Sequence, residues 1–381
     1  MRPSIHIMLK PASGLCNLRC KYCFYADETS KREIASYGMM SQETLRNVLQ
    51  KTLAESARQV TIAFQGGEPM LAGLAFFQQT IDFVKELNGN RCAVNYALQT
   101  NGTLLNEEWC RFFAENHFLI GVSLDGNKEF HDRNRLDAQG KGTYSRVMHG
   151  IQLLKQYKVE FNILTVLTSE ICRNFRKIYG FYSRNGLEFQ QYIPCLDPLE
   201  EKRGGHPWSL TPERFEQYLK TAFDCWYQDA MRGEKKYHRY FDNLLLIWNG
   251  QPPEACGMGG CCGMQYVVEA DGSVYPCDFY MLDSWRLGNL NTDSFEQLDR
   301  KRTELGFIEQ SAIPDPECLT CRWRALCRGG CRRDRDFFEQ GLQKNYYCSA
   351  YQSFFTYAVP RLRQVYEKLL YTCYSSDRSV Q

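Results

Sequence analysis

The chain has 381 residues, of which 44% are hydrophobic and 24% charged, and its formal net charge is +2. This length allows one large domain and a smaller one, and the balanced charge gives no basic footprint of the kind that binds nucleic acid. The longest apolar runs, such as NLLLIW, are far shorter than a membrane span, and residues 1–25 contain no apolar signal-peptide core. We therefore expect a cytoplasmic protein with no nucleic-acid or membrane partner.

From residue 3 to about 196, β-rich apolar runs alternate with amphipathic helical patterns. The predicted strands lie at residues 4–9, 60–64, 93–98, 118–124, 160–167 and 187–193, and the predicted helices at residues 41–56, 74–87, 107–116, 144–157 and 174–185. Strand, helix, strand in this order implies parallel strands joined by right-handed crossovers. Six such units predict an incomplete β/α barrel or an open doubly wound sheet.

Polar and glycine-rich segments follow the first four predicted strands. Three cysteines follow the first strand, QGGEP the second and QTNGT the third, and the fourth strand ends as SLDG. Parallel α/β folds build their sites from the loops at the carboxyl ends of the strands. These segments are therefore expected to meet at one face, although GGE or DG alone is more often just a turn.

The three cysteines are Cys16, Cys20 and Cys23, in a C-x3-C-x2-C spacing. Four thiolates would close a zinc site or ligate every corner of an iron-sulfur cube, whereas three leave one corner open. If this segment binds a 4Fe-4S cluster, its fourth iron is free to chelate a small molecule. A loop of reduced thiols, or half of a zinc site completed from elsewhere, is the alternative.

Residues 197–212 are polar and rich in Gly and Pro, which predicts a connector. Helices are expected at residues 212–231 and 240–250, and a β-hairpin at 266–277, where Asp271-Gly272 supplies the turn. We place a first domain with its connector helices at residues 1–235, and a second at residues 236–381.

Eight further cysteines with ligand-like spacing lie in the second domain. They are Cys256, Cys262, Cys277, Cys318, Cys321, Cys327, Cys331 and Cys348. Two four-cysteine zinc sites would use this set, but two fully ligated iron-sulfur clusters are the more economical interpretation beside an open triad. The other seven cysteines are expected to act as small buried hydrophobes: Cys92, Cys110, Cys172, Cys195, Cys225, Cys261 and Cys373.

The motif CNLRCKYC resembles the signature of the radical S-adenosylmethionine enzymes, and the second cysteine array resembles their SPASM extension. Across nearly the whole chain, including FQGGEP, LQTNGT, CLDPL, DGSVYPCDFY and CRGGCRR, the sequence is similar to anaerobic sulfatase-maturating enzymes. The resemblance implies a partial (β/α)6 TIM-like barrel, followed by a cysteine-rich SPASM-type domain with two auxiliary iron-sulfur clusters and a C-terminal helix.

The same resemblance implies an activity and its cofactors. These enzymes oxidise a Cys or Ser in a sulfatase motif of the C/S-x-P-x-R type to formylglycine, using three 4Fe-4S clusters and S-adenosylmethionine. The open iron would bind the amino nitrogen and carboxylate of S-adenosylmethionine, whose cleavage gives a 5′-deoxyadenosyl radical that abstracts hydrogen from the substrate Cβ. A sulfatase polypeptide and an electron donor such as ferredoxin or flavodoxin are the implied partners.

Carried over residue by residue, the resemblance gives five positions that hold S-adenosylmethionine: Tyr22, Gly67, Ser123, Arg135 and Leu196. Asp278 would be the base that deprotonates the substrate. The nearer auxiliary cluster would take Cys256, Cys262, Cys277 and Cys331, and the farther one Cys318, Cys321, Cys327 and Cys348. Cys261 adjoins Cys262 and could also reach iron, but the spacing to Gly272 favours Cys262.

Two other functions stay open at this point. One is a SPASM enzyme that modifies a ribosomally made peptide by thioether formation, crosslinking or epimerisation. The 15 residues before Cys16 are too few for the leader-binding domain that many such enzymes carry, which favours a maturase. The other is a non-catalytic iron-sulfur or zinc protein, against which the full set of strand-end loops argues.

Overall fold

The computed structural model describes residues 1–234 and 236–377, with side chains through Lys368. The chain forms two compact units, each assembled from three separate segments. Unit 1 is Met1–Leu124, Lys128–Ile163 and Met264–Glu309, and unit 2 is Asp125–Asn127, Leu164–Gly263 and Gln310–Gln381. The domain boundary expected at residue 235 stays a prediction. Within the described residues, no helix combines the length and apolar character that crossing a membrane requires.

All six predicted strands of the alternating region form. In unit 1 the hydrogen-bonded order is β10-β9-β8-β1-β2-β3-β4. The four strands that come first in the sequence are parallel to one another: β1 (Arg2–Leu9), β2 (Ser56–Phe64), β3 (Ala93–Thr100) and β4 (Phe118–Ser123). In β1, Ile5, Ile7 and Leu9 are buried and pair in register with Val60, Ile62 and Phe64 of β2. These side chains, most of them β-branched, fill this part of the core.

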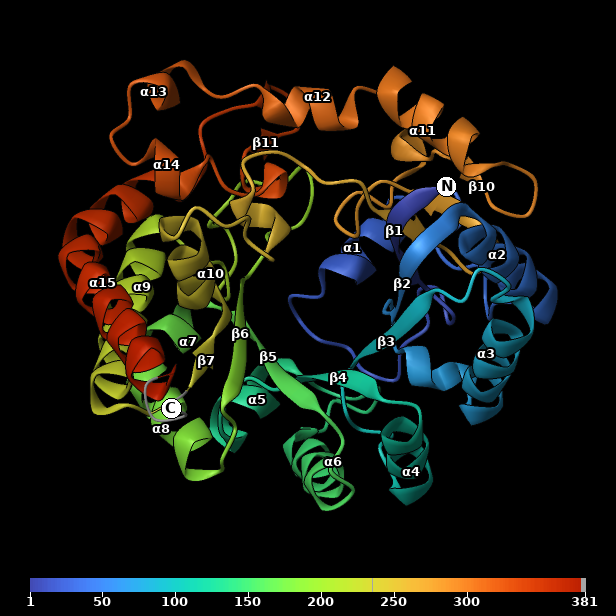
Figure 1. Cartoon of the computed structure of the whole chain (residues 1–381), viewed down its shortest axis with the longest axis horizontal. Coiled ribbons are helices and arrows are strands. Elements are labelled where there is room, and N and C mark those ends of the chain that lie inside the picture. Colours follow the sequence, from blue (N-terminus) through green and yellow to red (C-terminus); the bar gives the residue numbers. More distant parts are fainter. Residues whose placement is uncertain (235, 378–381) are drawn as a thin grey trace. The chain divides into compact units, whose positions relative to one another are not determined.

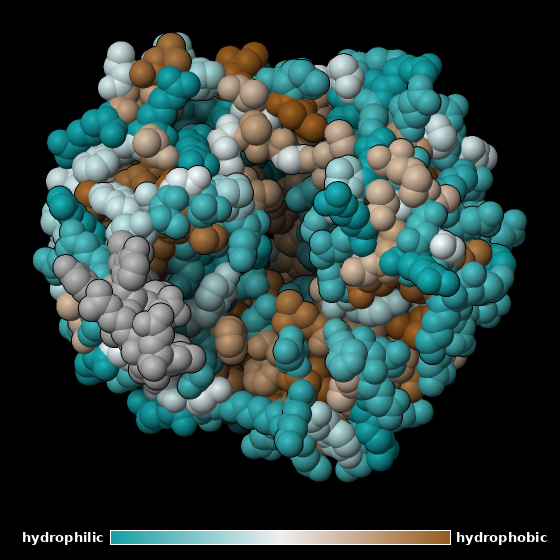
Figure 2. All heavy atoms as spheres, in the orientation of Figure 1, coloured by the Kyte–Doolittle hydropathy of each residue, from teal (hydrophilic) through white to brown (hydrophobic). Residues whose placement is uncertain are grey.

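Amphipathic helices cover one side of these strands. Figure 1 shows α2 and α3 on the outer side of β1 to β3 and α1 on the other side, and the outward faces of α2 and α3 are mostly hydrophilic in Figure 2. The N-cap Ser41 accepts the Thr44 amide hydrogen at the start of α2. The helices of unit 1 are α1 (Phe24–Ser30), α2 (Gln42–Glu55), η1 (Pro69–Ala72), α3 (Leu74–Leu87), α4 (Glu107–Glu115), α5 (Lys128–Asn134), α6 (Tyr144–Gln156), η3 (Asp283–Trp285) and α11 (Phe295–Glu304).

The predicted hairpin is confirmed as β8 (Tyr266–Val268) and β9 (Ser273–Tyr275), with β10 (Gly288–Asn289) antiparallel to β9. Gly272 has a φ of +88° at the turn, which a glycine adopts without strain. The position of the hairpin in the sheet was not predicted: its strand β8 pairs in parallel with β1. A segment from the cysteine-rich half of the sequence therefore extends the sheet that carries the cysteine triad.

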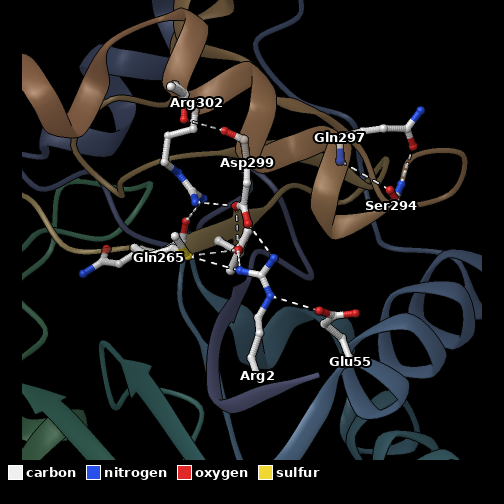
Figure 3. A network of polar contacts seen from close by, with 10 residues as sticks. Arg2, Glu55, Gln265, Ser294, Gln297, Asp299 and Arg302 are labelled. Carbon is white, nitrogen blue, oxygen red and sulfur yellow. Dashed lines mark hydrogen bonds and ion pairs between the residues drawn. The ribbon is translucent and has the colours of Figure 1, made fainter.

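A polar network fastens the start of β1 to α11 (Figure 3). The Arg2 guanidinium donates to Glu55 at 3.2 Å and to Asp299 at 2.5 Å, and Arg302 donates to Asp299 at 2.7 Å and to the Gln265 carbonyl at 2.6 Å. The contact between Arg2 and Asp299 joins residues 297 positions apart, so it depends on the tertiary fold rather than on local sequence.

Unit 2 combines a short parallel strand pair with long helices. Phe223 of α9 and Phe354 of α15 pack edge to face at 5.8 Å, and Arg361 donates to Asp224 at 2.9 Å. Its elements are α7 (Ser169–Arg173), α8 (Phe175–Arg184), β6 (Phe189–Pro194), α9 (Pro212–Arg232), β7 (Tyr237–His238), α10 (Arg239–Trp248), η2 (Cys256–Met258), α13 (Pro316–Leu319), α14 (Arg324–Cys327), η4 (Arg332–Asp334), β11 (Asp336–Phe337), β12 (Gly341–Leu342) and α15 (Cys348–Asp377). Two elements cross the unit boundary: β5 (Phe161–Leu167) and α12 (Phe307–Ala312).

Candidate active site

The cysteine triad lies on the loop between β1 and α1, at the carboxyl end of β1, and all three thiols are partly buried. The Cys23 amide donates to the Cys20 carbonyl at 3.2 Å, which folds the loop back on itself, and the Leu18 amide donates to the Cys16 sulfur at 3.4 Å. Burial, with smaller effects of Glu68 and Cys23, raises the pKa of the Cys16 thiol to about 11. A thiolate here therefore requires a cation, which a bound iron would supply.

The side chain of Asn101, from the loop after β3, lies beside Cys16. The Asn101 amide donates to Asn17 at 2.8 Å and lies 3.9 Å from the Cys16 sulfur, and Asn17 donates to the Thr103 hydroxyl at 2.9 Å. Such donors stabilise a cysteine sulfur and tune a cluster that it holds. The QTNGT motif thus meets the triad, as the strand-end argument predicts.

Glu68 of the QGGEP motif is fully buried and fastens two loops together. Its carboxylate accepts the Met70 amide at 3.1 Å, the Thr100 hydroxyl at 2.9 Å and the Asn101 amide at 2.8 Å. Burial raises the pKa of this carboxyl to about 7, although the three hydrogen bonds act to lower it. Its carboxylate therefore fixes the loops after β2 and β3 relative to each other.

Gly67 is held by packing against the cysteine loop. Its amide donates to the Ser13 carbonyl at 3.0 Å, and a Cβ added here would lie 2.0 Å from the Leu15 carbonyl oxygen. Every other residue type carries a Cβ, so only glycine fits this backbone approach. The packing of the protein itself therefore requires glycine at position 67, whatever contact Gly67 makes to a cofactor.

Asp278 follows β9 and lies against residues at the ends of β1 and β2. Its carboxylate forms an ion pair with the ammonium of Lys10, which is fully buried, and accepts a hydrogen bond from the Gln65 amide at 2.5 Å. The Lys10 ammonium also lies 4.4 Å from the ring centre of Tyr25. Three segments therefore meet at one carboxylate, within unit 1 and at the same strand ends as the triad.

A second buried ion pair lies behind Tyr25. The Tyr25 hydroxyl donates to Glu269 at 2.8 Å, and the Arg32 guanidinium donates to the same carboxylate at 2.7 Å, with both charged side chains fully buried. Burial, and then Glu269, raises the pKa of the Tyr25 hydroxyl, so the phenol stays a hydrogen-bond donor. The aromatic ring under Lys10 is thereby fixed in orientation.

Sequence reasoning missed Lys10, Gln65 and Tyr25 as members of this site. A signal existed for the first, because a lysine directly after a buried apolar strand points to the strand-end face. Gln65 was part of a motif quoted for its glycines. Nothing local predicts the pairing of residues 10 and 278.

The five positions predicted to hold S-adenosylmethionine divide between the units. Tyr22 and Arg135 are buried in unit 1, and the Arg135 guanidinium lies 5.5 Å from the Tyr22 ring centre. Ser123 ends β4 and accepts a hydrogen bond from Gln99 at 3.2 Å. Leu196 follows β6 in unit 2 and is partly buried. Their contacts to a cofactor stay a prediction.

Four predicted ligands of the farther auxiliary cluster line one cavity of about 330 Å³ in unit 2; they are Cys318, Cys321, Cys327 and Cys348. Three of the predicted ligands of the nearer auxiliary cluster also lie in unit 2: Cys256, Cys262 and Cys331. The pKa of the Cys331 thiol is raised mainly by burial and then by Asp334, with smaller contributions from Cys256 and Cys262. The fourth, Cys277, belongs to unit 1.

Hydrogen bonds to sulfur recur at the predicted ligands. The backbone amide two residues further on donates to the sulfur of Cys16, Cys277 and Cys331, at 3.4, 3.5 and 3.4 Å. This arrangement suits a thiolate bound to iron. Among residues 1–234 and 236–377, no group of three or more His, Cys, Asp and Glu side chains already has the arrangement of a metal site. A bound metal ion would itself draw the ligand side chains into that arrangement.

The remaining cysteines separate into two groups. Cys92, Cys110, Cys172, Cys195 and Cys225 are buried, as predicted. The prediction is wrong for Cys261, which is exposed, and the side chain of Cys373 lies outside the described residues.

Comparison with known proteins agrees with this fold and with the presence of iron-sulfur clusters. Residues 11–181 match the Radical SAM superfamily, and residues 260–322 match SPASM, an iron-sulfur cluster-binding domain. The fold and the cysteine sites therefore define a radical S-adenosylmethionine enzyme, which uses a 4Fe-4S cluster and S-adenosylmethionine and carries auxiliary iron-sulfur clusters in its SPASM domain.

The chain is 44% identical over 97% of its length to the cysteine-type anaerobic sulfatase-maturating enzyme of Clostridium novyi (strain NT), of which it covers 99%. It is 46% identical over 95% of its length to the enzyme of that description from Clostridium perfringens (strain 13 / Type A), covering 98% of it. A solved structure described as native anSMEcpe with bound AdoMet and Cp18Cys peptide matches with a TM-score of 0.92 and 45% identity, over 96% of this chain and all of the other. The chain belongs to the family of anaerobic sulfatase-maturating enzymes.

Proposed function

We propose that this enzyme oxidises a cysteine in a C-x-P-x-R motif of a sulfatase polypeptide to Cα-formylglycine. The observation that carries the proposal is the Asp278 carboxylate, held by Lys10 and Gln65 at the strand ends where the cysteine triad also lies. Relatives named cysteine-type are 44 to 46% identical to the chain, and those named serine-type 29 to 30%, which favours cysteine over serine as the target.

When bound, the cluster on Cys16, Cys20 and Cys23 together with S-adenosylmethionine supplies a 5′-deoxyadenosyl radical that removes hydrogen from the substrate Cβ. Tyr22, Gly67, Ser123, Arg135 and Leu196 are the proposed contacts to S-adenosylmethionine. A guanidinium suits the carboxylate of that cofactor, because their hydrogen bonds are charge-assisted. This is the role we assign to Arg135.

Asp278 is the proposed general base. After hydrogen loss at Cβ, the substrate must lose the thiol proton and one electron to become a thioaldehyde, which water hydrolyses to the aldehyde and hydrogen sulfide. Lys10 and Gln65 fix the carboxylate, so that an oxygen can face the substrate sulfur without a change of rotamer. The electron requires an acceptor, a role that auxiliary clusters held by the cysteines of the second domain would supply.

The auxiliary clusters take the ligands that the family pattern assigns. Cys318, Cys321, Cys327 and Cys348 would hold the farther one, which their common cavity supports. Cys256, Cys262, Cys277 and Cys331 would hold the nearer one. Three 4Fe-4S clusters imply about twelve irons per chain, whereas about four irons with two zincs would contradict this assignment.

The decisive experiment is anaerobic incubation of the reconstituted enzyme with S-adenosylmethionine, a chemical reductant and a peptide containing C-x-P-x-R, followed by mass spectrometry. We expect the cysteine to exchange its sulfur for an aldehyde oxygen, with formation of 5′-deoxyadenosine. A matched S-x-P-x-R peptide should react more slowly. A thioether, crosslinked or epimerised peptide would instead support peptide modification of the other kind.

A further inference from the structure

Two segments of unit 1 carry the groups that the proposed reaction brings together. Cys23 of the triad is the N-cap of α1, and Asp278 follows β9 of the hairpin. Phe24 and Phe279, the residues next to these two, pack edge to face with their ring centres 4.9 Å apart. Tyr25 is buried in an apolar cluster with residues of the hairpin. The triad segment and the Asp278 segment are therefore packed directly against each other.

A buried ion pair adds direction to this packing. Glu269 lies in the turn of the hairpin, and one of its carboxylate oxygens accepts the Ala270 amide of that turn at 2.9 Å. The other oxygen accepts the Tyr25 hydroxyl at 2.8 Å and the Arg32 guanidinium at 2.7 Å, both from the segment that begins at the triad. Hydrophobic contact has no preferred direction, whereas hydrogen bonds to a carboxylate do. Glu269 therefore holds the hairpin against the triad segment in one orientation.

The loop after α1, which begins near Arg32, continues this connection. The Glu33 amide donates to the Asp283 carboxylate at 2.8 Å, in the segment that follows the hairpin. The Tyr37 amide donates to the hydroxyl of Ser13, which precedes the triad on the cysteine loop, at 3.0 Å. This loop thus contacts both the cysteine loop and the part of the chain that carries Asp278.

The ion pair reaches Asp278 through two side chains. The Tyr25 ring, which is oriented by its hydrogen bond to Glu269, lies 4.4 Å from the Lys10 ammonium. Lys10 in turn pairs with Asp278. An aromatic face attracts a cation through the quadrupole of the ring, so the orientation of the ring decides where the ammonium is stabilised. A shift of the Tyr25 ring would therefore move Lys10 and, with it, the carboxylate.

We propose that Arg32 and Glu269 are positioning residues, which hold Asp278 in register with the cysteine triad so that cleavage of S-adenosylmethionine is followed by oxidation of the peptide. The inference rests on the proposed function and adds to it the coupling of its two halves. A misplacement of about 1 Å can cost on the order of 10²-fold in rate. Radical formation does not use the base, so loss of the pair should uncouple the two halves rather than stop both.

The pair could instead serve only the stability of the fold. Replacing a buried ion pair by apolar groups often leaves stability unchanged or raises it, whereas removing one partner leaves an uncompensated charge. A purely stabilising role predicts a less stable variant that still converts one peptide for the same amount of 5′-deoxyadenosine. A positioning role predicts a lower ratio of converted peptide to 5′-deoxyadenosine, even when both residues are replaced by apolar ones.

The test measures this ratio in the reconstituted holoenzyme with the C-x-P-x-R peptide under dithionite. We expect Arg32→Met to lower the ratio at least about tenfold, with 5′-deoxyadenosine formation within about threefold of the parent, because only the position of the base changes. The control is Arg2→Met, which removes the hydrogen bonds of Arg2 at the opposite end of β1 and should lower stability at an unchanged ratio. Hydrogen exchange measured by mass spectrometry should be faster at residues 23–31 in Arg32→Met and unchanged there in Arg2→Met.

Three results would overturn the inference: an unchanged ratio in Arg32→Met, an equal fall in Arg2→Met, or unchanged hydrogen exchange at residues 23–31. If Arg32→Met loses iron, the double variant Arg32→Met, Glu269→Leu removes the unpaired carboxylate as well. A low ratio in the double variant supports positioning, and a parent-like ratio contradicts it. The ratio counts any converted peptide, whereas the mass of the product tests formylglycine formation, so failure of this inference is distinguishable from failure of the proposed function.

Discussion

Two cysteine sites of this enzyme are built in opposite ways. The triad of Cys16, Cys20 and Cys23 lies at the end of a parallel strand, where amides, a hydroxyl and a buried carboxylate from neighbouring strand ends converge. The four cysteines that line the cavity of about 330 Å³ in unit 2 lie on two short helices, on a loop and at the start of α15, in a segment with exposed arginines and aliphatic groups. The two sites therefore differ in their surroundings rather than in their exposure, because the thiols of both are partly buried.

The largest expected effect tests the triad. Replacing Cys16, Cys20 and Cys23 by alanine should reduce 5′-deoxyadenosine formation to background, because no iron remains to chelate S-adenosylmethionine. Chromatographic assay of 5′-deoxyadenosine under dithionite measures this. The matched variant with Cys318, Cys321 and Cys327 replaced should still cleave S-adenosylmethionine. Cleavage by the first variant at the parent rate would show that the two sites do not differ in this way.

The next effect separates cofactor cleavage from substrate oxidation within unit 1. Asp278→Asn keeps the shape of the side chain but removes a carboxylate base, and the loss of such a base typically costs about 10²- to 10⁴-fold. We expect 5′-deoxyadenosine to form while formylglycine appears more slowly by about that factor. Mass spectrometry of the peptide, with 5′-deoxyadenosine measured in the same sample, gives both rates.

Asp278→Asn also leaves the Lys10 ammonium buried without its partner, which is costly in itself. The double variant Lys10→Met, Asp278→Asn removes that unpaired charge. If the lost base is the cause, the double variant stays slow. If the double variant recovers the parent rate, the defect came from the lysine and Asp278 is not the base.

A smaller effect concerns how the cysteine loop is held. Gly67→Ala places a Cβ about where the Leu15 carbonyl oxygen lies, so the cysteine loop must shift. We expect a loss of about 3 kcal/mol in unfolding free energy, at the upper end for overpacking, together with weaker iron binding by the triad. Gly89→Ala is the control, since nothing lies within 4 Å of its added Cβ. Urea unfolding of both variants measures this, and equal stability would contradict the packing argument.

The sequence predicted the fold better than the candidate active site, for physical reasons. Strands such as 60–64 and helices such as 74–87 follow from local apolar periodicity, and the hairpin follows from Asp271-Gly272. The parallel pairing of β8 with β1, and with it the meeting of Lys10 and Asp278, joins distant segments whose local patterns are unrelated. Cysteine spacing indicated candidate ligands, and it favoured Cys262 over the adjacent Cys261 as a ligand.

The smallest expected effect tests which of the adjacent thiols, Cys261 or Cys262, binds iron. Cys262 is partly buried, its amide donates to the Ser311 hydroxyl at 2.8 Å, and Cys256 contributes to its raised pKa, of which burial is the main cause. Cys261 is exposed and lines the cavity of about 330 Å³ instead. Cys262→Ala should therefore lower the iron content by about four atoms per chain, the number in one cluster. Cys261→Ala should keep all the iron and change formylglycine formation by less than about twofold, as surface substitutions usually do. Iron analysis of the two reconstituted variants distinguishes the two assignments. The reverse pattern would make Cys261, rather than Cys262, the ligand.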